Sequence, residues 1–81
     1  MRLELYYYTQ CPFCMRVLRK IDELGLEEKI SFKNTLEVPA NREFHIQKTG
    51  RTTVPCLYIE GEPLFESSDI CQWLEENQSK I

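Results

Sequence analysis

The chain has 81 residues, of which 42% are hydrophobic and 28% charged, and its net charge is −3. This size predicts one domain over residues 1–81, and the composition is typical of a water-soluble globule. The chain has no Lys/Arg cluster, which argues against a nucleic-acid surface, and no apolar run approaches the roughly 20 residues of a membrane helix. The N-terminal segment MRLELYYYTQ lacks the pattern of a secretory signal. We therefore expect a cytoplasmic, monomeric protein that binds neither nucleic acid nor membrane.

The first part of the chain predicts a strand followed by a helix. Residues 3–8 are rich in aromatic and aliphatic side chains, which predicts a buried strand. After it, apolar side chains recur at helical spacing and predict an amphipathic helix that ends near Gly25. Pro12 suits the first position of this helix, so Cys11 is expected at its N-cap.

The rest of the chain predicts three more strands and two more helices. The strands are expected at residues 29–33, 54–60 and 64–65. One helix is expected over residues 38–48, with His45 on its solvated face and without a functional role. The last helix is expected to be capped by Ser67, Ser68 and Asp69. The order β-α-β-α-β-β-α predicts an α/β fold with a four-stranded mixed sheet and helices on both faces.

Residues 11–14 read CPFC, at the predicted turn from the first strand to the first helix. A thiol reacts as its thiolate, and the unpaired N–H groups and the dipole of a helix N-terminus favour an anion. We therefore expect Cys11 to be an exposed nucleophile whose thiolate is stabilised by first-turn N–H groups, including that of Cys14. Cys14 is expected inside the helix, as the shielded thiol that resolves a disulfide on Cys11.

Two other interpretations of CPFC are open, namely half of a zinc site and a static disulfide. A zinc site needs more ligands, but no second CxxC and no HxxxH pattern follows, and His45 is the only histidine. A disulfide across so few residues restricts little of the unfolded chain. Cys56 and Cys71 are expected to be structural thiols in a strand and a helix. A redox pair is therefore the favoured interpretation, and no metal site is expected.

Three stretches, YTQCPFC, RTTVPCLYIEG and FESSDI, together resemble glutaredoxins of the thioredoxin superfamily. The resemblance spans nearly the whole chain, and EPLFESSDICQWL is also similar to the N-terminal domain of soluble glutathione transferases. It implies a thioredoxin-like (glutaredoxin) fold and a glutathione-dependent disulfide oxidoreductase that works through Cys11 and Cys14. Its substrates would be protein disulfides and glutathionylated proteins, with glutathione as the reductant and cosubstrate.

The resemblance also implies a glutathione site around Thr53-Val54-Pro55. The proline is expected to follow a cis peptide bond, an arrangement that is found almost only before proline. Val54 would then offer its backbone N–H and C=O to the cysteinyl part of glutathione, which would lie beside it like an added strand.

The start of the last helix is implied to hold the γ-glutamyl end of glutathione. A helix N-terminus offers N–H groups to a carboxylate, and Ser67 and Ser68 lie in that position. The acidic partner of the glutathione ammonium group is expected to be Asp69, with Glu66 as the second candidate.

Two positions depart from the usual glutaredoxin motif. Tyr8 stands where many glutaredoxins carry a lysine, so the charge partner of the glycyl carboxylate has to come from elsewhere. The candidates are the Tyr8 hydroxyl, Gln10, Gln47 and Arg51. Phe13 replaces a tyrosine and is expected to form an apolar rim of the site.

Three other functions are compatible with these residues. A [2Fe–2S] glutaredoxin, acting as cluster carrier or sensor, would use Cys11 of two subunits and two glutathiones, but Pro12 stiffens the loop and disfavours it. A non-catalytic glutathione-binding module would resemble a transferase domain and leave CPFC unused. A redoxin served by thioredoxin reductase would not need the segment 67–69.

Overall fold

The structure is a computed structural model that describes all residues 1–81. Its strands and α-helices are, in chain order, β1 (Leu3–Tyr7), α1 (Pro12–Leu24), β2 (Ser31–Asn34), α2 (Pro39–Thr49), β3 (Cys56–Ile59), β4 (Glu62–Phe65) and α3 (Ser67–Asn77). Short 3₁₀ helices at Glu27–Lys29 and Gln78–Lys80 were not expected from the sequence. The predicted order of elements is confirmed, and the observed bounds differ from the predicted ones by only a few residues.

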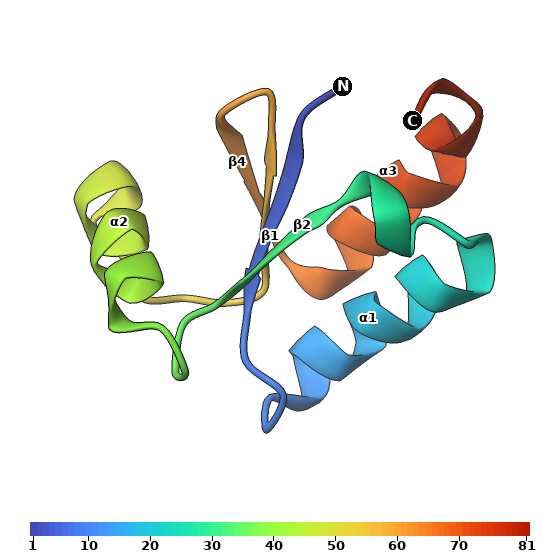
Figure 1. Ribbon diagram of the computed structural model, residues 1–81. Helices are drawn as coiled ribbons and strands as arrows, with labels where there is room; N and C mark the ends of the chain where they lie inside the picture. The colour runs from blue at the N-terminus through green and yellow to red at the C-terminus, as the bar shows by residue number, and fades with distance from the viewer.

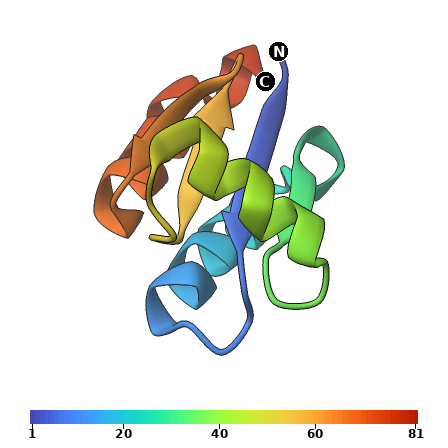
Figure 2. The same cartoon turned by 90° about the vertical axis from the view of Figure 1, so that its left-hand side faces the viewer.

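The four strands form one mixed sheet in the order β2-β1-β3-β4. Strand β1 runs parallel to β2 and antiparallel to β3, and β4 runs antiparallel to β3. Helices α1 and α3 cover one face of this sheet, while α2 lies alone on the other face (Figures 1 and 2). The predicted α/β architecture, with helices on both faces, is therefore confirmed.

Helix α1 begins and ends as its sequence predicts. Cys11 is the N-cap in an extended conformation, and Pro12 occupies the first turn, where its missing N–H costs no hydrogen bond. The helix ends at Gly25, whose φ of 67° lies in the left-handed region that favours glycine. The Gly25 N–H closes the last turn by donating to the carbonyl groups of Asp22 and Ile21.

The main core fills the space between the sheet and the helices α1 and α3. Side chains alternate along β1 and β3, so Leu3, Leu5 and Leu57 point towards these two helices. The buried members of this core are Leu3, Leu5, Val17, Ile21, Leu26, Ile30, Leu57, Ile70, Cys71 and Leu74. All of them are apolar or thiol side chains, so this layer is held mainly by burial of apolar surface.

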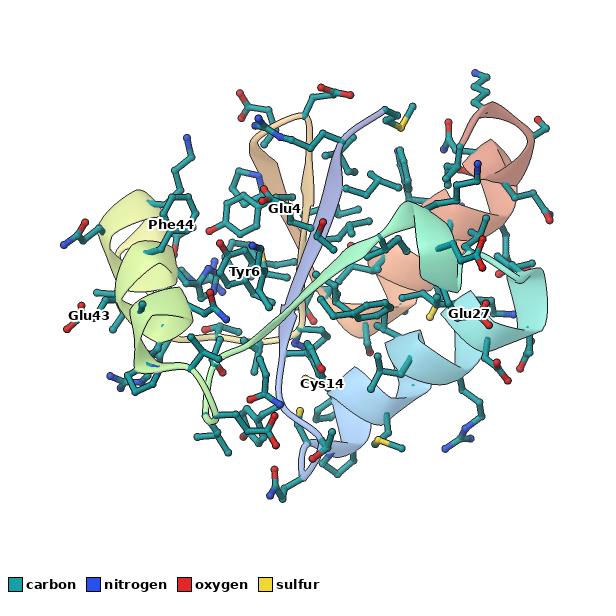
Figure 3. All side chains as sticks on the ribbon, in the orientation of Figure 1. Glu4, Tyr6, Cys14, Glu27, Glu43 and Phe44 are labelled. Carbon is teal, nitrogen blue, oxygen red and sulfur yellow. The ribbon has the colours of Figure 1, made fainter.

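The opposite face of the sheet carries aromatic and polar side chains beneath α2. Tyr6 of β1 stacks on Phe44 and His45 of α2, with ring centroids 5.7 Å and 5.4 Å away, and Tyr58 of β3 meets it edge-on at 4.9 Å. Figure 3 shows Tyr6 and Phe44 between the sheet and α2. The prediction of a solvated His45 is wrong, because its ring is fully buried in this cluster.

The two chain ends lie close together at one end of the sheet. The turn between β1 and α1, which carries Cys11, lies at the opposite end (Figures 1 and 2). The helices are too short, and insufficiently apolar, for any of them to cross a bilayer.

Candidate active site

Cys11 occupies the N-cap of α1, and its Sγ accepts a hydrogen bond from the Cys14 N–H at 3.4 Å. The first turn of α1 contains no acidic residue. The sulfur therefore faces the positive end of the helix dipole, without a neighbouring carboxylate on that turn. The predicted contact between Cys11 and the first helical turn is confirmed.

The two thiols of the CPFC pair differ in burial. Cys14 is 0% exposed and Cys11 is 7% exposed, so Cys14 is the more shielded sulfur, as expected. The prediction that Cys11 is well exposed is wrong, because its side chain folds over the helix end to reach the Cys14 N–H. All four cysteines are free thiols, so the site is described in its reduced form.

The chemical environment of Cys14 suits a thiol that stays protonated until it is needed. Burial raises the pKa of Cys14 to about 12, and a hydrogen bond with the Tyr8 backbone only partly offsets this effect. At neutral pH, Cys14 is therefore a poor nucleophile. The two thiols thus differ in their surroundings, and Cys14 is the one held in its protonated form.

A hollow of about 330 Å³ opens beside the CPFC turn. It is lined by Phe13, Arg16, Thr53, Val54, Pro55, Glu66, Ser67 and Ser68. These residues come from three separate places in the chain: α1, the segment before β3, and the start of α3. The fold thus brings most of the predicted binding residues to one place. Phe13 is 62% exposed at this hollow, while Asp69 lies outside it.

The segment before β3 presents an open backbone to this hollow. The Val54–Pro55 peptide bond is cis, as expected. Neither the N–H nor the C=O of Val54 has a hydrogen-bond partner within the chain. Buried or half-buried backbone groups are normally paired, so the unpaired groups of half-buried Val54 mark a place where an extended peptide can add.

The start of α3 differs in detail from its prediction. The helix begins at Ser67 with Glu66 at the N-cap, and no side chain caps it, so the expected capping by Ser67, Ser68 and Asp69 is wrong. The physical reason is that Glu66 adopts a φ of 74°, a left-handed conformation that is uncommon for residues other than glycine. The first N–H groups of α3 thus have no side-chain cap and are available to an anion.

A second hollow, of about 340 Å³, also adjoins the Thr53–Val54 segment. Its lining residues are Tyr8, Thr35, Leu36, Arg42, His45, Thr52, Thr53 and Val54. Thr53 and Val54 therefore border both hollows. Tyr8 belongs to this second hollow rather than the first, and Arg42 is the only basic side chain, apart from the buried His45 ring, that lines it.

Three candidates for the glycyl carboxylate line neither hollow, namely Gln10, Gln47 and Arg51. The Arg51 guanidinium instead lies over the Phe65 ring, 4.0 Å from its centroid. Sequence reasoning missed Arg16 and Arg42. A signal for Arg16 was available, because it lies three residues after Phe13 and so shares its helix face.

His45 contacts the segment before β3 directly. Its Nε2 lies 2.7 Å from the Thr53 carbonyl oxygen, and its Nδ1 lies 2.7 Å from the Tyr58 hydroxyl. Both ring nitrogens are thus paired, which explains how a polar side chain tolerates full burial here. Burial also raises the pKa of Tyr58 above its ordinary value, so its hydroxyl keeps its proton. No group of three or more His, Cys, Asp and Glu side chains gathers to hold a metal ion.

The sequence matches a known domain family over most of its length. The family described as "Glutathione S-transferase, N-terminal domain" matches residues 5–80. Glutaredoxin 3 of Escherichia coli strain K12 is 32% identical over 73 residues, which cover 84% of this chain and 80% of that protein. The similarity to transferases therefore extends well beyond the C-terminal segment from which it was inferred.

Solved structures agree on the fold. An epsilon-class glutathione S-transferase from the housefly, Musca domestica, superposes with a TM-score of 0.78 at 23% identity, covering 99% of this chain and 37% of that one. A glutathione transferase homologue from Sulfitobacter, with bound glutathione, gives a TM-score of 0.74 at 18% identity, covering 98% of this chain and 38% of that one. The chain thus spans little more than a third of these transferases.

Proposed function

The chain belongs to the glutathione S-transferase N-terminal domain family and shares the thioredoxin-like fold of glutaredoxins, and from that premise we propose that it is a glutathione-dependent thiol–disulfide oxidoreductase. The observation that carries the proposal is the Cys11 Sγ at the open end of α1, hydrogen-bonded by the Cys14 N–H at 3.4 Å. A binding domain that only holds glutathione has no need of a second, buried thiol three residues further on.

The two hollows suit a tripeptide that lies across Val54. The cysteinyl residue of glutathione pairs with the free Val54 N–H and C=O, which directs its sulfur towards Cys11. The γ-glutamyl end then occupies the first hollow, where the N–H groups of Ser67 and Ser68 take its carboxylate. Glu66 takes its ammonium group, in preference to Asp69, because Glu66 lines that hollow and Asp69 does not.

The glycyl end occupies the second hollow in this arrangement. Arg42 takes the glycyl carboxylate, with Tyr8 beside it, in place of the lysine that Tyr8 replaces. Thr53 borders both ends, while Phe13 and Pro55 form apolar contacts with the substrate. This assignment gives each of the three charged groups of glutathione a partner, with Arg42 for the glycyl carboxylate, Glu66 for the ammonium group and the N–H groups of α3 for the γ-glutamyl carboxylate.

The reaction with a glutathionylated protein proceeds by two exchanges. The Cys11 thiolate attacks the glutathione sulfur, the protein–glutathione S–S bond breaks, and the protein leaves as a thiolate that takes up a proton. The glutathione remains on Cys11 as a mixed disulfide. A second glutathione thiolate then attacks the bound glutathione sulfur, which releases oxidised glutathione and restores the Cys11 thiolate.

A protein disulfide follows a route that also uses Cys14. Cys11 attacks one sulfur and forms a mixed disulfide with the protein. Cys14 then attacks Cys11, its proton passes to the departing protein thiolate, and a Cys11–Cys14 disulfide forms. Two glutathione molecules reduce this disulfide and become oxidised glutathione. A reducing cytoplasm, which keeps both thiols free, is the compartment in which a monomer of this kind would work.

A second candidate function is a glutathione-binding domain without redox turnover. The match of residues 5–80 to the transferase N-terminal family favours it. In this case S-methylglutathione would bind with measurable affinity, yet no disulfide would be reduced.

The test compares cysteine variants in the reduction of a glutathionylated peptide, with glutathione, glutathione reductase and NADPH. We expect Cys11→Ser to reduce the rate to that of the uncatalysed exchange, because it removes the attacking thiolate. Cys14→Ser should keep most of this activity and lose the reduction of protein disulfides. Cys71→Ser is the matched control, since Cys71 is also a nearly buried free thiol but belongs to α3 rather than to the CPFC turn. Full activity in Cys11→Ser would overturn the proposal.

A further inference from the structure

His45 lies beneath the Thr53–Val54 segment, with its Nε2 2.7 Å from the Thr53 carbonyl oxygen. Its ring is 0% exposed and is packed by Tyr6, Tyr58 and Phe65, with ring centroids at 5.4, 5.8 and 5.8 Å. It comes from α2, on the face of the sheet opposite to α1 (Figure 2). His45 lies at the wall of the second hollow, but its ring has no exposed surface and both of its nitrogens are paired within the chain, so it acts on the Thr53–Val54 segment.

The hydrogen bonds of His45 fix its tautomer. The Thr53 carbonyl oxygen can only accept a hydrogen bond, so the Nε2 atom, 2.7 Å away, carries the hydrogen. In the neutral ring Nδ1 is then the acceptor, and the Tyr58 hydroxyl donates to it at 2.7 Å. The two bonds form a chain, Tyr58 O–H to Nδ1 and Nε2–H to the Thr53 oxygen, in which each bond polarises the next.

The Thr53 carbonyl belongs to the same peptide unit as the Val54 N–H. This unit is planar and trans, since the only cis bond of the chain is the next one along. In a trans unit the C=O and the N–H point in opposite directions. The bond from His45 holds the Thr53 oxygen towards α2, and it thereby turns the unpaired Val54 N–H towards the ligand side of the segment.

We propose that His45 is a positioning residue, which in its neutral Nε2–H form holds the Thr53–Val54 peptide plane so that the Val54 N–H is aimed at the cysteinyl backbone of glutathione. The inference rests on the proposed function only for the identity of that ligand. The Thr53–Val54 segment is therefore held in two ways, by packing and by one directional hydrogen bond from His45 of α2.

The first test is spectroscopic and needs no substitution. Because the chain contains one histidine, ¹⁵N-labelled protein gives a single set of imidazole signals. We expect an unprotonated Nδ1 and a protonated Nε2 at neutral pH, with the Nε2 hydrogen protected from exchange with solvent. An Nδ1–H tautomer, or a rapidly exchanging ring, would overturn the proposal.

The second test measures the dissociation constant of S-methylglutathione, which binds without reacting. His45→Leu removes the donor to Thr53, and we expect it to weaken binding roughly tenfold, the value of one well-placed hydrogen bond. His45→Gln keeps an N–H₂ donor that can reach the Thr53 oxygen, so it should recover part of this loss. The rate at which iodoacetamide alkylates Cys11 should stay unchanged in both variants, because that reagent does not use Val54.

Ile46→Ala is the matched control on the same helix. Ile46 is half-buried in α2 but makes no side-chain hydrogen bond, so its truncation lowers stability without releasing Thr53. Equal binding by folded His45→Leu and the wild-type chain would overturn the inference. A wild-type chain that binds S-methylglutathione but reduces no disulfide would instead contradict the proposed function and leave this inference standing. A chain that does not bind S-methylglutathione would contradict both.

Discussion

The two faces of the sheet are built from different chemistry. The face towards α1 and α3 is covered by aliphatic side chains such as Leu5, Ile21 and Leu74. The face towards α2 carries rings and polar atoms, with His45 hydrogen-bonded to Tyr58. The first layer is stabilised by apolar burial, which has no preferred direction, whereas the second depends on bonds that act only at set distances and angles.

This difference matches the parts of the site that each layer supports. Cys11 caps α1 and Cys14 lies in its first turn, so the proposed redox pair rests on the aliphatic layer. The Thr53–Val54 segment is held by His45, so the proposed recognition segment rests on the aromatic and polar layer. In this small domain, one face of the sheet mainly stabilises the fold, and the other mainly orients the Thr53–Val54 segment.

The largest loss of stability is expected from a substitution in the aliphatic layer. Leu5 is fully buried in the central strand β1, and Leu5→Ala is expected to lower the free energy of unfolding by about 2–5 kcal/mol. Urea denaturation measures this loss. The fraction that stays folded should bind S-methylglutathione as the wild-type chain does. Weaker binding by that folded fraction would mean that the aliphatic layer also orients the site.

A smaller effect is expected from the aromatic and polar layer. Tyr58→Phe removes the hydroxyl that donates to His45 Nδ1 and leaves that buried acceptor unpaired, which costs about 1–3 kcal/mol. The Thr53 oxygen still requires the Nε2–H form, so binding of S-methylglutathione should weaken less than in His45→Leu. Urea denaturation and ligand titration of the same sample check both statements. If Tyr58→Phe binds S-methylglutathione as weakly as His45→Leu does, then the Tyr58 hydroxyl, rather than the His45 ring alone, orients the Thr53–Val54 peptide plane.

The effect that is smallest near neutral pH, and grows only as the pH rises above 9.0, concerns Cys56, which is fully buried on the aromatic side. Burial raises its pKa from 9.0 to about 12 in the folded chain. Because the folded state holds this proton more tightly, the stability contributed by Cys56 is present below pH 9.0 and is lost as the pH rises towards about 12. The unfolding temperature of the wild-type chain should therefore fall more steeply with rising alkaline pH than that of Cys56→Ala. Unfolding temperatures that fall equally with pH in the two proteins would contradict this expectation.

The sequence predicted the aliphatic layer better than the aromatic one. The strand β1 and the helix α1 follow from residues close together in the chain, such as Val17, Ile21 and the terminating Gly25. Helix spacing and a glycine stop are local signals, and local signals are what a sequence displays directly. The position of Cys11 at the N-cap of α1 was predicted for the same reason.

The predictions that failed concern distant partners. His45 is buried because Tyr58 and Thr53, thirteen and eight residues further on, pair with its ring. Nothing near residue 45 indicates these contacts, and its neighbour Phe44 is itself half exposed. The backbone of Glu66 is a similar case, since a positive φ at a non-glycine residue has no reliable sequence signal. Arg42 and Arg16 join the hollows only once the helices pack against the sheet.

The position of the chain ends has a practical consequence for measuring the protein in cells. Both ends lie at the edge of the molecule far from the CPFC turn (Figure 1). A fluorescent redox reporter fused to either end would leave the approach to the thiols unobstructed. The same geometry allows the domain to be tethered to a sensor surface with the CPFC turn facing the solution.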